Sequence, residues 1–248
     1  MSPATVPRMV LDFDGVICDP ANECRLVTWL AAHPPDPSLP ISSYLVAVER
    51  GFAARFMHIR GYARLLEHFV VAHHPGAEAV SSRAEFTALF GSIPGDEVAA
   101  FVEAAGAVRR RFRTEETFGW AALHPLYRGV AKLFRDHPGV IAVASARDSA
   151  SVYTILDYRG LGGTVAEVAG ECRSKADAVL DLCARYGLDP GEITFVDDNL
   201  ENVTAVAAAG ASAYWAMWGH HVPEDLAVAR QAGVRRLELD ELPQIIPV

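Results

Sequence analysis

The second half of the chain alternates short apolar runs with segments of helical periodicity, and this alternation most constrains the fold. Apolar runs predict strands at residues 140–144, 164–168, 193–196 and 213–218. Helical patterns separate them; one is opened by Ser174 and ended by Gly187, and the next is ended by Gly210. Strands that alternate with helices of about 10–15 residues indicate βαβ units. The sequence therefore predicts an α/β fold with a parallel sheet and helices on both faces.

A further strand is expected near the start of the chain, at residues 9–11. Asp12 and Asp14 follow it, one residue apart, and Gly15 ends the strand. Ligands bind at the carboxyl ends of strands in open α/β sheets. Two carboxylates this close repel each other, so we expect a divalent cation beside them. One carboxylate could then attack an electrophile while the other transfers a proton. The alternative is an Asp-rich turn without chemistry.

Residues 19–124 carry helical patterns and no strand pattern. A long helical pattern covers residues 43–72, with interruptions at Gly51 and Gly61, and shorter ones cover residues 83–90 and 96–113. We therefore expect a helical domain of residues 19–124, inserted into an α/β domain made of residues 1–18 and 125–248.

Polar residues also follow three of the later predicted strands. Ser145 could bind a phosphate oxygen or simply cap a helix. Lys175 is one of only two lysines in the chain and lies at the start of a helix, where a lysine is unfavourable to the helix dipole. Asp197 and Asp198 end the strand at 193–196, and two adjacent carboxylates again call for a cation.

Taken in order, these residues resemble the four motifs of the haloacid dehalogenase superfamily. The resemblance rests on Asp12-Phe13-Asp14-Gly15-Val16, Ser145, Lys175 and the run from Asp197-Asp198 to Asn202. It implies a Rossmann-like parallel sheet with a helical C1-type cap domain inserted after the first motif.

The resemblance also implies a role for each matching residue. Asp12 would be the nucleophile that becomes an aspartyl-phosphate, and Asp14 the general acid and base. Ser145 would bind the phosphoryl group and Lys175 would balance its charge. Mg²⁺ would be held by Asp12, the backbone carbonyl of Asp14, and Asp198. Asp197 and Asn202 would lie behind these ligands, and Gly15 and Ala146 would contact the substrate. Apart from the resemblance, Arg60 lies near a glycine break in the helical insertion and could also face the substrate; the alternative is a place on a solvated helix face.

Several reactions are compatible with this superfamily. The dehalogenases of this superfamily lack the second acid of the first motif. Because Asp14 is present at that position, phosphoryl transfer is favoured over dehalogenation. The absence of lysine before Lys132 argues against phosphonate cleavage through an imine on a cap lysine. We therefore expect a Mg²⁺-dependent phosphatase that acts on a small phosphorylated metabolite. A sugar-phosphate mutase and a non-catalytic binding module remain as alternatives.

Composition limits the possible partners. A net charge of −9 argues against binding to nucleic acid or to an anionic membrane. The four cysteines form no Cys-x-x-Cys pair, and no segment is apolar enough for a signal peptide or a membrane span. We expect a reduced, cytoplasmic protein, and the sequence leaves its oligomeric state open.

Overall fold

A computed structural model describes residues 6–247, which divide into two compact units. The first unit consists of the chain up to Asp19 together with the segment that begins at Pro125. The second unit runs from Pro20 to His124. The first boundary, after Asp19, lies one residue beyond the boundary expected after residue 18. The second, after His124, coincides with the boundary expected there.

The first unit is built on a six-stranded parallel sheet in the order β3-β2-β1-β4-β5-β6. In the centre, Val10 of β1 pairs with Ala142 of β2 on one side and Phe195 of β4 on the other. The chain therefore winds outward in opposite directions from β1, which makes the β1–β4 border the switch point where ligands bind in such sheets. The strands are β1 (Met9–Leu11), β2 (Ile141–Ala144), β3 (Val168–Ala169), β4 (Thr194–Asp197), β5 (Ser212–Ala216) and β6 (Arg235–Leu237).

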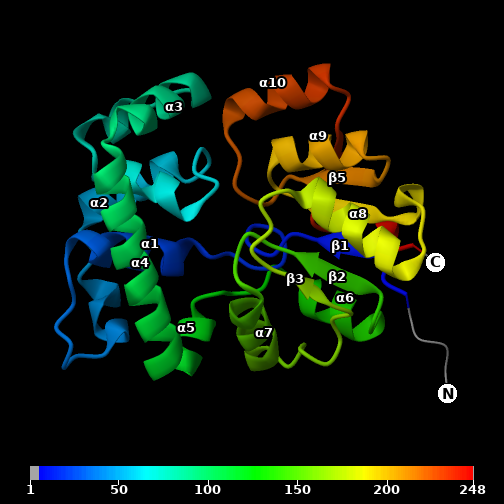
Figure 1. Cartoon of the computed structure of the whole chain (residues 1–248), viewed down its shortest axis with the longest axis horizontal. Helices are drawn as coiled ribbons and strands as arrows, with labels where there is room; N and C mark the ends of the chain where they lie inside the picture. Colours follow the sequence, from blue (N-terminus) through cyan, green and yellow to red (C-terminus); the bar gives the residue numbers. More distant parts are fainter. Residues whose placement is uncertain (1–5, 248) are drawn as a thin grey trace. The chain divides into compact units, whose positions relative to one another are not determined.

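Helices cover both faces of this sheet, as predicted, with α8 and α9 on one face and α6 and α7 on the other (Figure 1). Beneath α8 and α9, side chains such as Val179, Val203, Phe195 and Trp215 pack into one buried apolar cluster. Burial on both faces explains why the central strands read as continuous apolar runs. The helices are α6 (Val130–Asp136), α7 (Ser149–Tyr158), α8 (Lys175–Tyr186), α9 (Leu200–Ala208) and α10 (Pro223–Gln231).

Local signals fix where the helices of the first unit begin and end. The Ser174 side chain accepts a hydrogen bond from the Asp177 N–H, and Gly187 ends α8 in the left-handed conformation at φ 66°. Asp148 caps α7 by accepting from the Ser151 N–H. Because a cap sets the residue at which a helix begins, Lys175 is fixed as the first residue of α8.

The second unit is helical, and its described residues contain no strand. The long helix α4 packs against α1, with Phe101, Ala105 and Phe112 buried on α4 and Leu26 and Leu30 buried on α1. The α-helices are α1 (Ala21–Ala32), α2 (Arg50–Ile59), α3 (Arg83–Ser92), α4 (Gly95–Glu115) and α5 (Thr117–Ala122). Short 3₁₀ helices lie at Ile41–Val46, Leu66–His73 and Pro75–Ala79.

Two predicted elements differ from the structure. The strand expected at 164–168 is shorter and lies later in the chain, because β3 covers only Val168–Ala169. Before it, the Ala166 N–H already donates to the Ile141 carbonyl of β2. Regular pairing begins only at Val168, after the loop that contains Gly162 and Gly163. The helical pattern at 43–72 is one α-helix between two 3₁₀ helices, and α2 ends at Ile59, just before Gly61.

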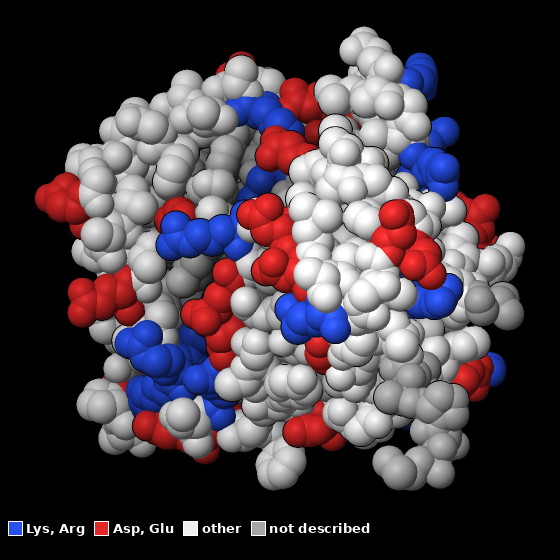
Figure 2. All heavy atoms as spheres, turned by 45° about the vertical axis from the view of Figure 1, so that its right-hand side comes forward, with Lys and Arg blue, Asp and Glu red and all other residues white. Residues whose placement is uncertain are grey.

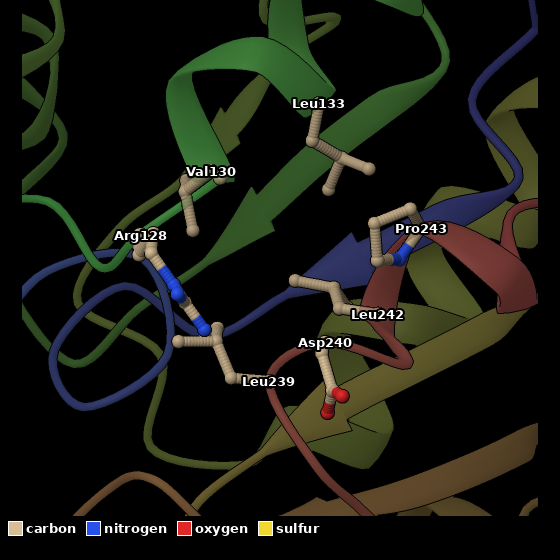
Figure 3. A pocket seen from close by; sticks show the side chains of 8 residues that line it. Arg128, Val130, Leu133, Leu239, Asp240, Leu242 and Pro243 are labelled. Atoms are coloured by element: carbon tan, nitrogen blue, oxygen red, sulfur yellow. The ribbon is translucent and has the colours of Figure 1, made fainter.

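Three further features complete the description of residues 6–247. On the face drawn in Figure 2, acidic and basic side chains both occur in several places. In the first unit, a pocket lies between the start of α6 and the C-terminal segment, lined by Val130, Leu133, Leu239, Leu242 and their neighbours (Figure 3). Within residues 6–247, no helix is both long and apolar enough to cross a membrane.

Candidate active site

Asp12 and Lys175 form a buried ion pair at the carboxyl end of the central strand. Asp12 directly follows β1, and its N–H donates to the Val196 carbonyl of β4 at 2.9 Å. Lys175 Nζ lies 2.6 Å from Asp12 Oδ1 and also donates to the Ala144 carbonyl at the end of β2. Asp12 and Lys175 are 8% and 5% exposed. The first residue of α8 thus places its ammonium group between the ends of β1 and β2.

Asp197 and Asp198 approach Asp12 from the end of β4. Asp197 is fully buried and accepts hydrogen bonds from the Asn199 N–H at 2.8 Å and from the Asn202 side-chain amide at 2.9 Å. Asp198 Oδ2 accepts from the His220 N–H at 2.7 Å. Asn202 therefore acts on the cluster through Asp197, while Asp198 is oriented by the loop that follows β5.

Two glycines make room for the Asp198 side chain. Gly15 has φ +96°, and a Cβ there would lie 2.0 Å from Asp198 Oδ2. A Cβ on Gly219 would lie 2.3 Å from Asp198 Cβ and 2.6 Å from the Gly15 carbonyl oxygen. The first-motif loop and the loop after β5 therefore close around this carboxylate, and only glycine fits at both positions.

Ser145 lies in the loop that follows β2. It is buried, and its hydroxyl oxygen accepts a hydrogen bond from the Arg147 N–H at 3.1 Å. This local turn fixes the Ser145 side chain and leaves its hydroxyl hydrogen available as a donor. Ala146, between these two residues, is exposed.

Asp14 is paired with an arginine that the sequence did not single out. Arg147 Nε lies 3.0 Å from Asp14 Oδ2, and Arg147 Nη2 lies 3.2 Å from Oδ1. The Arg147 side chain is 3% exposed and that of Asp14 is 25% exposed. Arg147 is two residues after Ser145, so its place in the second motif was the signal that could have identified it.

Burial and charge shift the ionisation of this cluster. Burial raises the pKa of Asp12, and the neighbouring Lys175 ammonium opposes that rise. Burial and the negative charge of Asp12 raise the pKa of Asp197 well above its usual value. Burial alone would lower the pKa of Lys175, but Asp12 and Asp197 attract its proton and raise it. Lys175 is therefore a cation, and the raised pKa values of Asp12 and Asp197 reflect the cost of ionising all of these neighbouring carboxyls without a metal ion.

Three carboxylates are close enough to share one metal ion. Oxygen atoms of Asp12, Asp197 and Asp198 lie within 4.8 Å of one another, and all three residues are buried. With Asp14 included, four carboxylates face two cations, Lys175 and Arg147, which leaves two negative charges when all are ionised. A divalent cation would compensate them, and carboxylate oxygens are the donors that hard cations prefer. These residues therefore fit a divalent metal.

The remaining predicted residues lie differently. Gly15 adjoins Asp198, so the structure gives it a steric role. Arg60 belongs to the helical unit, where it is 9% exposed, donates to the Ala63 carbonyl at 3.3 Å and lies over the Phe69 ring. These contacts account for its burial, and its contact with substrate stays a prediction. Gly219 and His220 were not identified from the sequence, because their contacts with Asp198 depend on the path of a loop.

Comparisons with known proteins agree with this arrangement. A family model described as haloacid dehalogenase-like hydrolase matches residues 8–210. No curated protein matches the chain.

Solved structures match almost the entire chain. A predicted phosphoglycolate phosphatase from Haemophilus somnus is 18% identical, with a TM-score of 0.63 over 97% of this chain and 98% of its own. A haloacid dehalogenase-like protein from Streptococcus pneumoniae is 12% identical, with a TM-score of 0.62 over 98% of each chain. A predicted phosphatase from Clostridium acetobutylicum is 14% identical, with a TM-score of 0.57 over 96% of this chain and 97% of its own.

These structures share the fold of both units. Together with the family match and the clustered aspartates and lysine, they show that the chain belongs to the haloacid dehalogenase-like hydrolases.

Proposed function

We propose that this protein is a Mg²⁺-dependent phosphatase that hydrolyses a small phosphomonoester through an aspartyl-phosphate. The observation that carries the proposal is the buried Asp12–Lys175 pair beside Asp197 and Asp198 at the β1–β4 switch point. A lysine that neutralises one edge of a carboxylate cluster lowers the cost of bringing in a phosphate dianion. Phosphoryl transfer depends mainly on such charge compensation and on positioning.

Two half-reactions follow from this arrangement. An Asp12 carboxylate oxygen attacks phosphorus, the bond from phosphorus to the leaving oxygen breaks, and Asp14 gives that oxygen its proton. Water then attacks the phosphorus of the aspartyl-phosphate and passes a proton to Asp14, and the bond from phosphorus to Asp12 breaks. Asp14 is thereby returned to its starting state, and inorganic phosphate leaves.

The other residues of the cluster hold charge and geometry. Lys175 and the Ser145 hydroxyl are the donors for the phosphoryl oxygens, with Ala146 next to Ser145 in the same loop. Mg²⁺ would be held by Asp12, Asp198 and the backbone carbonyl of Asp14, and when bound it supplies charge neutralisation at the transferring group. Asp197, tied to Asn202, would stabilise Lys175 as a cation behind these ligands.

We infer that the substrate is a small molecule rather than a phosphoprotein or a nucleic acid. The inserted helical unit follows directly after the first motif, and inserted domains of this kind exclude water and bulky chains during transfer. The similar Haemophilus somnus protein carries the name of a predicted phosphoglycolate phosphatase. Phosphoglycolate therefore belongs in the substrate panel beside sugar phosphates and nucleotides.

The experiment that tests this function measures phosphate release by the purified protein. An aryl phosphate and a panel of phosphorylated metabolites are supplied with Mg²⁺, and then with a chelator. Release should require Mg²⁺ and should disappear in the Asp12→Asn variant, because the amide cannot attack phosphorus. Full activity of that variant, or of the parent in chelator, would contradict the proposal.

A further inference from the structure

The contact between Arg147 and Asp14 has a geometry suited to orienting a carboxylate. Arg147 Nε and Nη2 approach the two oxygens of Asp14 at 3.0 and 3.2 Å, so both oxygens are held at once. A planar guanidinium that binds a carboxylate through two parallel hydrogen bonds fixes its plane as well as its distance. The Arg147 side chain is 3% exposed, which limits competition from water for these bonds.

The backbone of Arg147 is itself held by its surroundings. Its N–H donates to Ser145 Oγ at 3.1 Å, and its carbonyl accepts from the Glu171 N–H at 2.9 Å. A Cβ on Gly170 would lie 2.8 Å from the Arg147 carbonyl oxygen and 2.3 Å from the Ser149 nitrogen. The segment after β3 therefore packs closely on the loop after β2, and the guanidinium is presented from a fixed base.

Within the Asp14 loop, the Cys18 thiol lies 3.8 Å from Asp14 Oδ1, a longer contact than either hydrogen bond from Arg147, so the guanidinium is the stronger restraint on this carboxylate. The Asp14 side chain is 25% exposed, and the residue leaves β1 at the point where Gly15 takes a left-handed conformation. General acid and base catalysis requires the carboxyl oxygen within hydrogen-bond reach of the proton it transfers. A carboxylate free to rotate would spend part of its time in positions that do not meet this requirement.

We propose that Arg147 is a positioning residue that holds the ionised Asp14 carboxylate in the orientation in which it accepts the proton of the attacking water in the second half-reaction. This inference rests on the proposed phosphatase function and adds to it a residue outside the family-motif positions singled out from the sequence. A different reading makes Arg147 a ligand of the substrate phosphate. The two differ in what they predict, because a positioning residue acts through Asp14 and a phosphate ligand does not.

A double-mutant cycle separates these readings. The variants are Arg147→Met, Asp14→Asn and the two combined, with Arg147→Lys as a conservative variant. Arg185→Met is the control, because Arg185 forms an exposed ion pair with Glu167 in the same unit. For each protein, kcat and KM for an aryl phosphate, inhibition by inorganic phosphate, and the free energy of unfolding are measured.

We expect Arg147→Met to lower kcat by about 10²-fold, the size of loss that follows from misplacing a catalytic group by about 1 Å. KM and inhibition by phosphate should change little. Arg147→Lys should recover kcat only in part, because an ammonium group can hold one oxygen of Asp14 but not both. In the Asp14→Asn background, Arg147→Met should lower kcat no further. The unfolding cycle should also be non-additive, and Arg185→Met should resemble the parent.

Other results would overturn the inference. Additive losses in kcat, or a loss expressed mainly as a raised KM with weaker phosphate inhibition, would make Arg147 a phosphate ligand. Additive effects on unfolding would show that Arg147 and Asp14 do not interact in solution. An inactive parent protein would instead count against the proposed function, and the unfolding cycle would still decide whether the pair exists.

Discussion

Asp198 lies one position and Asn202 five positions after Asp197, yet substitutions of these two residues should affect metal binding very differently. Asp198 offers a carboxylate to the cluster, whereas Asn202 donates to Asp197 and offers no charge. An ionised carboxylate outcompetes a neutral amide for a hard dication. Asp198→Ala should therefore raise the Mg²⁺ concentration needed for half-maximal activity far more than Asn202→Ala does. Titration of activity with Mg²⁺ measures both, and equal effects would refute the assignment of Asp198.

Substitution of a second single residue, Gly219, tests the position of the Asp198 carboxylate. A Cβ there would lie 2.3 Å from Asp198 Cβ, so Gly219→Ala should displace this carboxylate and raise the Mg²⁺ requirement. Gly163→Ala is the matched control, because a Cβ at Gly163 meets no atom within 4 Å. The measurement is again the Mg²⁺ dependence of activity. If the two alanine variants behave alike, the close fit of Gly219 against Asp198 is wrong.

At this scale the sequence predicted the residues carried by strand ends and missed those carried by loops. Asp12 and Asp198 could be brought together in advance, because the carboxyl ends of parallel strands meet at one edge of a sheet. Lys175 was singled out differently, as a lysine at the start of a helix, where its charge is unfavourable to the helix dipole. Arg147 and Gly219 could not be predicted, since their contacts depend on loop conformations that no periodicity records. The arginine was visible only as a neighbour of Ser145.

Elements with clear end signals were predicted well. The helix opened by Ser174 and ended by Gly187 is α8, and the apolar run at 140–144 contains β2. The edge strand β6 was missed, because Arg235 and Arg236 give its three residues no apolar pattern. The strand expected at 164–168 was placed too early, since the pairing that defines β3 begins only at Val168.

A buried charge network joins the first and last helices of the helical unit. Glu23 of α1 is fully buried and accepts from Arg109 Nε of α4 at 2.7 Å and from Arg109 Nη2 at 3.1 Å. The Trp120 indole of α5 lies 3.4 Å from the same carboxylate. Because Glu23 would otherwise be a buried charge without compensation, these three helices depend on one another.

Removing one partner of this network should be costly. Glu23→Gln removes the carboxylate charge that faces Arg109, and because the Arg109 side chain is 20% exposed we expect a loss of about 1.5–3 kcal/mol, the contribution of hydrogen bonds to charged groups. The free energy of unfolding in urea measures the loss. Glu115→Gln, which breaks the exposed pair with Arg111, is the control and should have little effect. Similar losses in the two variants would show that the buried network does not stabilise the unit.

For the whole molecule, the ionisation of the cluster should couple metal binding to pH. The pKa of Asp197 in the folded protein is raised well above its usual value near 3.8. The folded state therefore binds a proton that the unfolded state has released, and stability without metal should fall as pH rises from about 4 toward the raised pKa. Metal binding needs ionised carboxylates and releases protons. The increase in Tm on adding Mg²⁺ should thus grow with pH.

Thermal unfolding of metal-stripped and Mg²⁺-loaded protein across a pH series checks this prediction. Asp197→Asn should flatten the pH dependence of the Mg²⁺ effect, because the amide has no proton to release. A Mg²⁺ effect on Tm that is independent of pH in the parent protein would contradict the account of the cluster.

The central claim is that phosphate passes through a covalent bond to Asp12, and the mass of the intact protein tests it most directly. Protein with Asp14→Asn is mixed with an aryl phosphate and Mg²⁺, quenched in acid and measured. A good leaving group lets the first half-reaction proceed without the acid, while hydrolysis of the intermediate is slowed. We predict a species heavier by one phosphoryl group, located on Asp12 and absent from the Asp12→Asn, Asp14→Asn double variant. Rapid phosphate release with no such species, or the same species in the double variant, would contradict the claim.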